Sequence, residues 1–337
     1  IHMLSMFILY FFTTVFYIWI FDCFLKKVYM LHRAFGLSLA TLKQQPCWSP
    51  QILVMALPVA VVTGANSGLG LALSVKLAKN HLVFAGMRSL AKKDMLMQAA
   101  VEAAVAENLK PLELDVNTDA SVDSGLAVAL KDVGRVDVLV NNAGYSQAGS
   151  VEMMSMEQMK AQLETNLFGV IRCQKVVLPY MRSQKSGKII NISSVGGIWG
   201  QPFNDIYCAS KFALEGMMES QAPLFRTFGV YTSCVQPGAI KSAFWSNAQV
   251  PDVSSMPAEY GKPMQSTMTA YGKSGAVGQT PEEVADVIIQ KIIEVSEPPV
   301  RIQTNPSIQK VFDQQVGQNV SGDAALNMST TRFLADL

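Results

Sequence analysis

A tyrosine and a lysine four residues apart, Tyr207 and Lys211 in the segment YCASK, form a pair that can move a proton. At the beginning of a helix this spacing places both side chains on one face. A free phenol has a pKa of about 10 and is a poor acid or base at neutral pH. An ammonium group about 6 Å away, at an effective dielectric of about 20, is worth about 3 kcal/mol and should lower that pKa by about 2 units. The pair is therefore expected to donate a proton to a forming alkoxide or to accept one from an alcohol.

A hydroxyl thirteen residues before the tyrosine is placed to orient the substrate oxygen. This is Ser194 in NISSVGG, and one such neutral donor is worth about two orders of magnitude in rate. Ser193 is the competitor, but consecutive strand residues point to opposite faces, so only one of the two can serve. Asn166, in a long predicted helix upstream, is expected to position a water behind Lys211 as a proton relay. The alternative for Asn166 is a buried polar residue that bends its helix.

A glycine-rich turn, TGANSGLG from Thr63 to Gly70, directly follows an apolar run. The backbone N–H groups of such a turn, and the N-terminus of the helix after it, can approach a pyrophosphate closely. Glycine turns also begin helices for structural reasons alone, but the position after a first parallel strand favours a dinucleotide site. The candidate cofactor contacts in this turn are Gly64, Asn66, Ser67, Gly68, Leu69 and Gly70.

The residue that follows the second predicted strand selects the nicotinamide cofactor. An NAD site usually has an acid there, which accepts a hydrogen bond from the ribose 2′-hydroxyl. This chain reads Gly86-Met87-Arg88 instead, with no acid until Asp94. The planar fork of Arg88 suits a 2′-phosphate, although a solvated surface arginine is the alternative. NADP(H) is therefore favoured over NAD(H).

Two further strand ends are expected to contact the cofactor. Asp115, after the third predicted strand and followed by Val116, is placed to bind the adenine amino group, unless it caps the next helix. Asn142, Ala143 and Gly144 end the fourth strand, where small side chains let the backbone line the cofactor. Adjacent asparagines can also form a simple turn.

Short β-branched runs alternate with amphipathic stretches from Val59 onward. The runs are apolar almost throughout, as expected for strands buried on both faces. They are VAVVTG, HLVFAG, KPLELDV, VDVLVNNAG, KIINISS, VYTSCVQP and VRIQT. Helices are expected at about 69–79, 90–106, 119–132, 155–182, 206–222 and 281–295. This alternation predicts an α/β fold: a Rossmann-type, doubly wound, seven-stranded parallel sheet with helices on both faces, in a single domain.

One stretch interrupts this alternation. From Ala239 to Thr280 the chain has no clear period and is rich in Ser, Met, Gly and Pro. Loops of this length in a compact domain are usually functional or disordered. Because it follows the sixth strand, above the crevice where ligands bind in open α/β sheets, residues 239–280 are expected to form a substrate lid rather than a linker.

The N-terminal segment, residues 1–54, is expected to lie outside the catalytic domain, which covers residues 55–337. Residues 3–21 carry no charge and are long enough to cross a bilayer as a helix. Basic residues follow this run, which favours an uncleaved anchor of the endoplasmic reticulum type with the catalytic domain facing the cytosol. Alternatively, the folded domain starts at Met55 and is cytoplasmic, and residues 1–54 are an upstream extension absent from the working protein.

Composition restricts the function classes. The net charge is +1, with charges of both signs interspersed, which argues against a nucleic-acid partner. The five cysteines have no metal-type spacing and are expected to be buried free thiols. Three histidines leave little for a zinc site, so no metal is expected.

Taken in order, these motifs resemble the short-chain dehydrogenase/reductase family, in its single-domain branch. The resemblance covers about Val59 to Thr304 and comprises TGxxxGxG, NNAG, a helical Asn, Ser, YxxxK and a Pro-Gly pair. It implies a catalytic tetrad of Asn166, Ser194, Tyr207 and Lys211, because the thirteen-residue gap selects Ser194 over Ser193. The resemblance also implies that Tyr207 and Lys211 contact the cofactor. A basic residue after strand 2 is typical of NADP-preferring members.

The resemblance carries further expectations. Pro237 and Gly238 are implied to line the nicotinamide end, and Ser242 replaces a threonine that often binds the carboxamide in the family. A homodimer packed through the fourth and fifth helices is implied. Pro223 lies inside the fifth predicted helix, where a proline should end or kink it.

Within the family, VRIQTNPSIQKVF and ALEGMMES are similar to the hydroxysteroid and retinol dehydrogenase group. This similarity implies a small lipophilic substrate, either an alcohol or the matching ketone or aldehyde. Trp199, Phe203, Phe244 and Trp245 flank the expected opening and suit an apolar ligand, although ordinary packing also explains them. Two alternatives remain: a reductase of soluble carbonyl or ketoacyl substrates, and a non-catalytic NADP(H)-binding regulator.

Overall fold

The computed structural model describes residues 57–242, 244 and 256–316, all within the compact unit that runs from Val54 to Leu337. The predicted anchor at residues 3–21, the boundary at 54 and 55, and Trp245 lie outside these residues. Among the described helices, none is both long and apolar enough to cross a bilayer. The described cysteines, Cys173, Cys208 and Cys234, are buried and free, as predicted.

Seven parallel strands form one sheet, in the order β3-β2-β1-β4-β5-β6-β7. The central strands are buried on both faces, which explains their continuous apolar sequence. The edge strand β3 contains buried, half-buried and exposed residues. The predicted seven-stranded doubly wound sheet is confirmed. Strand bounds are β1 Val59–Thr63, β2 Leu82–Met87, β3 Leu109–Glu113, β4 Val138–Asn141, β5 Gly187–Ile192, β6 Val230–Gln236 and β7 Arg301–Gln303.

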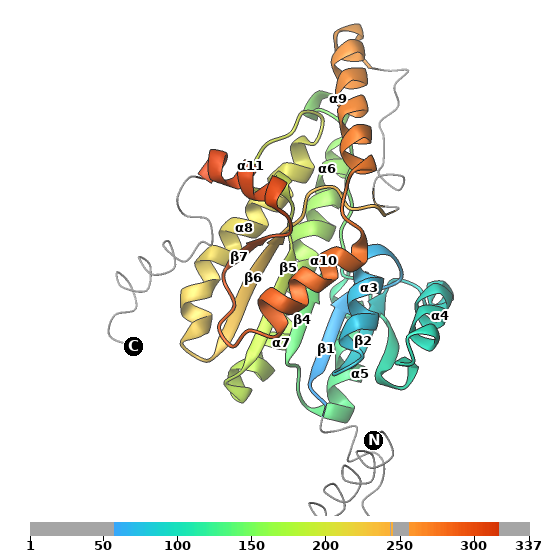
Figure 1. Cartoon of the computed structure of the whole chain (residues 1–337), viewed down its shortest axis with the longest axis vertical. Helices are drawn as coiled ribbons and strands as arrows, with labels where there is room; N and C mark the ends of the chain where they lie inside the picture. Colours follow the sequence, from blue (N-terminus) through green and yellow to red (C-terminus); the bar gives the residue numbers. More distant parts are fainter. Residues whose placement is uncertain (1–56, 243, 245–255, 317–337) are drawn as a thin grey trace, which may run out of the picture. The chain divides into compact units, whose positions relative to one another are not determined.

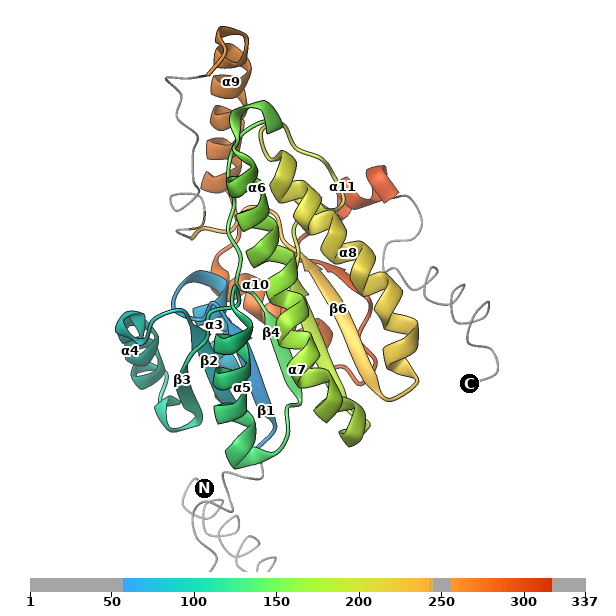
Figure 2. The same cartoon turned by 180° about the vertical axis from the view of Figure 1, so that it is seen from behind.

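Helices cover both faces of this sheet (Figures 1 and 2). On one face α3, α4 and α10 enclose a core with β1 and β2, which includes Leu73 and Ile288. On the other face α5 and α7 enclose a second core, which includes Leu126 and Val177, and α8 packs against β6. The helix bounds are α3 Gly68–Leu77, α4 Asp94–Glu102, α5 Asp119–Val133, α6 Met156–Leu163, α7 Gly169–Gln184, α8 Asp205–Arg226, α9 Ala258–Ala276, α10 Pro281–Ile288 and α11 Pro306–Val316.

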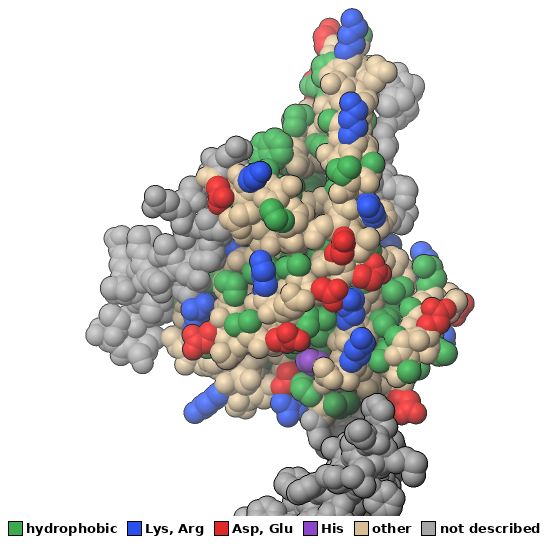
Figure 3. All heavy atoms as spheres, viewed as in Figure 1, with side chains coloured by type: hydrophobic (Ala, Val, Ile, Leu, Met, Phe, Trp, Pro, Cys, Tyr) green, Lys and Arg blue, Asp and Glu red, His purple; other side chains and the backbone are tan. Residues whose placement is uncertain are grey.

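The strand order reverses between β1 and β4, because β2 lies on one side of β1 and β4 on the other. Such a switch point opens a crevice at the carboxyl ends of the strands, where α/β sheets bind ligands. In Figures 1 and 2, α6 and α9 lie beyond this edge of the sheet. On the face shown in Figure 3, basic and acidic side chains are interspersed among apolar ones.

Several helices differ from the predicted ranges. The helix expected at 155–182 is divided by a π-helix, Glu164–Phe168, between α6 and α7. A second π-helix, Ile289–Ile293, follows α10. Of the early end or kink predicted at Pro223, the early end is wrong, because α8 continues to Arg226. Pro223 lies in the last turn of α8, where it cannot donate to the Glu219 carbonyl, yet the helix continues for three more residues.

The predicted lid contains regular structure. No helix was predicted between residues 239 and 280, but Ala258–Ala276 forms the 19-residue helix α9. The two ends of the lid are joined, because Ile240 and Gln279 form a parallel bridge. The Gln279 side chain donates to the Thr304 carbonyl at 3.1 Å and accepts from Asn305 Nδ2 at 2.7 Å. The lid is thus fastened at its base to the segment after β7.

Candidate active site

A cleft of about 1580 Å³ lies at the carboxyl ends of the strands. Its walls come from the turn after β1, the ends of β2 to β6, the loop before α8, and the lid helix α9. Pockets for drug-sized ligands usually measure about 300–1,000 Å³. This cleft is therefore large enough for a dinucleotide and a second molecule together.

The glycine turn forms the floor of the cleft, and all of its predicted contacts line it except Gly70. Gly64 has a φ of +65°, a conformation that side-chain-bearing residues rarely adopt. A Cβ on Gly70 would lie 2.3 Å from the Gly64 carbonyl oxygen, so Gly70 lets the turn close. Ser67 is the N-cap of α3, but its side chain does not cap the helix, and the first turn has no acid. The backbone donors of α3 are thus available to an anion.

Thr63 and Asn142 fasten the turn to the end of β4. The Thr63 hydroxyl accepts from the backbone N–H groups of Asn142 and Ala143, both at 3.0 Å. The Asn142 side chain donates to the carbonyls of Thr63 at 2.9 Å and Gly64 at 3.1 Å. Asn142, Ala143 and Gly144, the predicted cofactor contacts of this strand end, line the cleft. Both hydrogen bonds of the Asn142 side-chain amide go to the turn. Sequence reasoning missed Thr63, although its place at the end of the first strand was visible.

The end of the cleft near β2 is basic. Arg88 lines it, is exposed, and pairs with no carboxylate of the described chain. Ser89 and Lys92 line the same end and were missed by the sequence analysis. Lys92 could have been noticed as a second cation four residues after Arg88. A planar guanidinium beside an ammonium fits a phosphate group better than a ribose hydroxyl.

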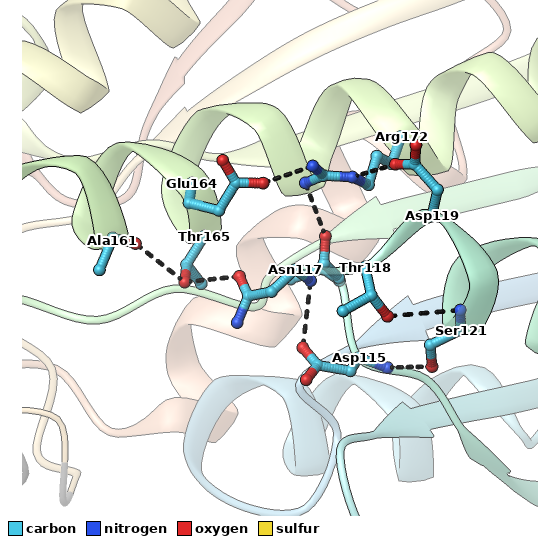
Figure 4. A network of polar contacts seen from close by, with 10 residues as sticks. Asp115, Asn117, Thr118, Asp119, Ser121, Ala161, Glu164, Thr165 and Arg172 are labelled. Atoms are coloured by element: carbon cyan, nitrogen blue, oxygen red, sulfur yellow. Dashed lines mark hydrogen bonds and ion pairs between the residues drawn. The ribbon is translucent and has the colours of Figure 1, made fainter. Parts of the chain in front are cut away.

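A polar network borders the cleft after β3 (Figure 4). The Asp115 carboxylate accepts from the Asn117 backbone N–H at 3.1 Å, and Asp115 is not part of the cleft lining, whereas Val116 is. The alternative that Asp115 caps the next helix is wrong, because Thr118 is the N-cap of α5. Asn117, missed from the sequence, lines the cleft and accepts from the Thr165 hydroxyl at 2.8 Å.

Tyr207 and Ser194 meet in the cleft. Tyr207 lies in the first turn of α8, and Ser194 follows β5. Both residues line the cleft, and Ser194 interacts with the Tyr207 phenol closely enough to lower its pKa. The Ser194 hydroxyl also accepts from the Gly196 N–H at 3.0 Å. The Ser193 hydroxyl has no hydrogen-bond partner in the described chain and lies beside Gly197 instead.

Lys211 lies one turn after Tyr207, with its ammonium nitrogen 5.7 Å from the centre of the phenol ring. Nζ donates to the Ile192 carbonyl at 2.7 Å, which leaves two of its three N–H donors for other partners. Burial lowers the pKa of Lys211 to about 8. Burial also raises the pKa of Tyr207 to about 12, although the hydrogen bond with Ser194 opposes this.

The predicted lowering of the phenol's pKa is therefore wrong for this structure. The loss of solvation around the buried ring outweighs the interaction with Ser194, which lowers this pKa. At neutral pH the phenol of Tyr207 keeps its proton and the ammonium of Lys211 keeps its charge. The arrangement is that of a proton donor.

Asn166 is buried in the π-helix and is not part of the cleft lining. Its side chain accepts from the Tyr145 N–H at 3.1 Å and donates to the Tyr145 carbonyl at 3.0 Å and to Ser210 Oγ at 3.1 Å. A Cβ on Gly144 would lie 3.1 Å from Asn166 Oδ1 and 3.8 Å from Lys211 Nζ. The Asn166 amide and the Lys211 ammonium thus lie close to the same point beside Gly144. Asn166 also belongs to the π-helix, as its alternative reading as a buried polar residue in a bent helix predicts.

Residues after β6 and from the lid complete the cleft. Pro237, Gly238 and Ser242 line it, and Ser242 lies against Gly68 of the glycine turn. Phe244 packs edge-to-face on Tyr207 with ring centres 6.0 Å apart. Trp199 also lines the cleft, whereas Phe203 is buried outside it.

The lid helix α9 faces the cleft with small and hydroxyl-bearing residues. Tyr271 donates a hydrogen bond to the Pro202 carbonyl at 2.7 Å and so ties α9 to the loop before α8. No group of three or more His, Cys, Asp and Glu residues within the described ranges could hold a metal ion. The lid residues in the lining are Ser266, Thr267, Ala270, Tyr271 and Ser274.

Comparisons with known proteins agree with this geometry. A model of the short chain dehydrogenase family matches residues 58–252. Retinol dehydrogenase 8 of Homo sapiens is 40% identical over 256 residues, which cover 73% of this chain and 80% of that protein. The 17-beta-hydroxysteroid dehydrogenase type 1 of Homo sapiens is 42% identical over 197 residues, which cover 56% of this chain and 59% of that protein.

Solved structures are similar as well. A short-chain dehydrogenase from Streptomyces avermitilis is 28% identical with a TM-score of 0.67, over 82% of this chain and 97% of that one. A single-residue variant of actinorhodin polyketide ketoreductase, solved with NADPH, is 28% identical with a TM-score of 0.62, over 75% of this chain and 98% of that one.

Proposed function

Because the chain belongs to the short-chain dehydrogenase family of oxidoreductases, we propose that it interconverts a hydrophobic alcohol and its ketone or aldehyde with NADP(H). The observation that carries this proposal is the convergence of Tyr207, Ser194 and Lys211 in one cleft with the uncapped N-terminus of α3. The glycine turn and the basic end of the cleft fit a phosphorylated dinucleotide.

When bound, the nicotinamide cofactor supplies or accepts the hydride. In the direction of reduction, Tyr207 gives its proton to the substrate oxygen as charge develops there. Ser194 donates a hydrogen bond to the same oxygen and stabilises that charge. The charged Lys211 stabilises the phenolate left behind, and a water held by Asn166 returns the proton to the site. In oxidation the same groups act in reverse.

Arg88 is proposed to select NADP(H), with Lys92 as a second phosphate contact. Support comes from their shared position at the basic end of the cleft and from the lack of a carboxylate partner for Arg88 within the described residues. Arg88→Asp should lower the ratio of kcat/KM for NADPH to that for NADH by about 100-fold, because a bidentate charged contact becomes a repulsion. Lys92→Gln should lower the ratio by only about threefold, because an ammonium contributes a point charge without a bidentate contact. An unchanged ratio in Arg88→Asp would mean that another residue selects the cofactor.

The substrate is proposed to be lipophilic, such as a steroid-, retinoid- or lipid-like alcohol or carbonyl compound. Apolar residues in the lining, including Trp199, Ile240 and Phe244, and the names of the two human relatives support this class. NADPH oxidation should be measured with ketones and aldehydes of increasing chain length. Indifference to length would favour a soluble substrate. NADPH binding without turnover on any of them would favour a regulator.

Tyr207→Phe tests the proposed chemistry directly. This variant should keep cofactor affinity and lose nearly all turnover, because the ring remains and only the proton donor is removed. Full turnover in Tyr207→Phe would refute the assigned mechanism.

Membrane association through residues 3–21 is also proposed, on the basis of their uncharged apolar sequence. The full chain should partition with membranes and remain there after a high-salt wash, whereas a chain that begins at Met55 should be released. Equal release of both chains would contradict this part of the proposal.

A homodimer packed through α7 and α8 is the proposed assembly. Large apolar side chains of α8 and of the π-helix before α7 are exposed, with 46% of Phe168, 47% of Phe212 and 48% of Leu224 accessible. Phe212→Glu should halve the mass measured by light scattering. A wild-type chain that is monomeric at all concentrations would contradict the dimer.

A further inference from the structure

A buried group of charged side chains lies behind the catalytic helix, between α8 and β7. Glu215 is 4% exposed and Arg301 8% exposed. Arg301 donates to Glu215 Oε2 at 2.8 Å through Nε and to Glu219 Oε2 at 2.6 Å through Nη2. The other Glu215 oxygen accepts from Gln236 Nε2 at 2.9 Å. Both carboxylate oxygens of Glu215 therefore have a fixed partner.

Glu215 is also a neighbour of the catalytic groups. It lies four residues after Lys211 on α8, so the two side chains share a helix face. Its Cγ is 3.1 Å from the place that a Cβ on Gly197 would occupy, in the loop that follows Ser194. Lys211 is 6% exposed and Glu215 4% exposed, so both charged side chains are largely removed from solvent. Interactions between charges are strongest in such surroundings.

Leaving a lone ammonium buried costs several kcal/mol unless a compensating charge lies close by. We propose that Glu215 is a positioning residue of the active site, whose buried carboxylate keeps Lys211 charged, and that Arg301 sets how strongly it does so. This inference rests on the proposed function, in which a charged Lys211 supports proton donation by Tyr207. A purely structural role, in which the ion pair only ties β7 to α8, is the alternative.

The titratable and charged groups around Lys211 decide the direction of the effect. They are Tyr207, Glu215 and Glu219 on α8, Cys234 on β6 and Arg301 on β7. Burial lowers the pKa of Lys211, and Cys234 and the charge of Glu215 raise it. Glu215→Gln should therefore lower that pKa. Arg301→Gln should raise it, because the carboxylate loses its neutralising partner and a nearby positive charge disappears.

The two variants thus have opposite expected signs. Charges one helical turn apart, about 6 Å at an effective dielectric of about 20, interact by about 2 pH units, and partial neutralisation reduces this to about one. In the pH–rate profile of NADPH-dependent reduction, the fall in rate at alkaline pH is expected at about pH 8. In Glu215→Gln this alkaline limb should move down by about one pH unit. At pH 8 the rate should then fall about fivefold. In Arg301→Gln the limb should move up, and in the matched Arg301→Lys it should stay in place.

A readout on the ligand-free full chain separates this inference from the proposed function. Lysine labelled with ¹³C at Cε reports the charge of Lys211 by NMR, once its signal is assigned by its loss in Lys211→Met. The pKa of Lys211 read from this NMR signal should fall in Glu215→Gln and rise in Arg301→Gln without any substrate. If Glu215→Gln does not fold, Glu219→Gln, at a position one-third exposed, should produce a smaller downward shift because Arg301 then neutralises Glu215 more fully.

Shifts of equal sign in Glu215→Gln and Arg301→Gln, or no shift in folded variants, would overturn the inference in favour of a structural tie. A wild-type chain with no carbonyl reduction would instead refute the proposed function, while the NMR shifts would still decide the role of Glu215.

Discussion

Replacing Lys211 with methionine should remove a cost of folding that depends on pH. Burial lowers the pKa of the Lys211 ammonium from its ordinary 10.5 to about 8. Below pH 8 the side chain is charged in both the folded and the unfolded chain, and the folded protein bears the full desolvation cost. A difference of about 2.5 pKa units corresponds to about 3 kcal/mol.

The sign of the pH dependence follows from the two pKa values. Between about pH 8 and 10.5 the folded protein has released the Lys211 proton while the unfolded chain still holds it, so wild-type stability gains from this group as pH rises. At pH 9.5 about 2 of the 3 kcal/mol should have been recovered. The methionine variant lacks this titration, so its advantage over wild type should shrink by about 2 kcal/mol between pH 7 and 9.5.

Urea unfolding of both proteins at these two pH values measures the effect. Other groups that titrate in this range, including Tyr207 and the cysteines, are common to both proteins and cancel in the difference. The hydrogen bond from Lys211 to the Ile192 carbonyl is also lost, which lowers the variant's stability by about 1 kcal/mol at both pH values. Lys79→Met, at an exposed position, should give the same difference from wild type at both. If Lys211→Met did the same, the ammonium would not be desolvated as the structure indicates.

Three further substitutions test the cleft. Gly70→Ala places a methyl group 2.3 Å from a carbonyl oxygen of the turn and should weaken NADPH binding at least tenfold. Its control Gly216→Ala has open space around it and should raise the free energy of unfolding by about 0.5–1 kcal/mol. Equal NADPH affinity in both variants would count against a phosphate-binding role of the turn. Ser194→Ala should lower kcat about 100-fold while Ser193→Ala leaves it unchanged, and the reverse order would reassign the oxyanion donor. Tyr271→Phe loses its hydrogen bond to the Pro202 carbonyl and should raise the KM for the substrate about fivefold in steady-state kinetics. The NADPH affinity, measured by titration, should stay constant. An unchanged KM would mean that this hydrogen bond does not hold the lid.

The sheet could be predicted from sequence because its strands are buried on both faces and therefore read as continuous apolar runs. Helix interruptions could not be predicted in this way. The π-helix around Asn166 depends on contacts with the Tyr145 backbone and Ser210, which come from distant parts of the chain. Helix α9 was missed because Met264 is its one buried residue among those described, so no apolar period marks it.

Sequence spacing placed the proposed catalytic groups relative to one another but did not predict their electrostatics. The interval between Tyr207 and Lys211 fixes a shared helix face, whereas the degree of burial depends on what the rest of the chain places around them. The same limit applies to Asn142, whose residue type suggested a cofactor contact, although its side chain is engaged with the carbonyls of the turn. Glu215 carried no local signal because its partner Arg301 lies 86 residues away.

The fastening of the lid at Ile240 and Gln279 has a consequence for how this protein can diversify. Both ends of the lid leave the catalytic body at a single point, so the sequence between them can lengthen, shorten or be exchanged without moving a strand end. Closing a longer loop between fixed ends adds only about 0.6 kcal/mol for each doubling of its length. The segment between Ile240 and Gln279 can thus evolve as a replaceable module while the residues at the strand ends stay the same.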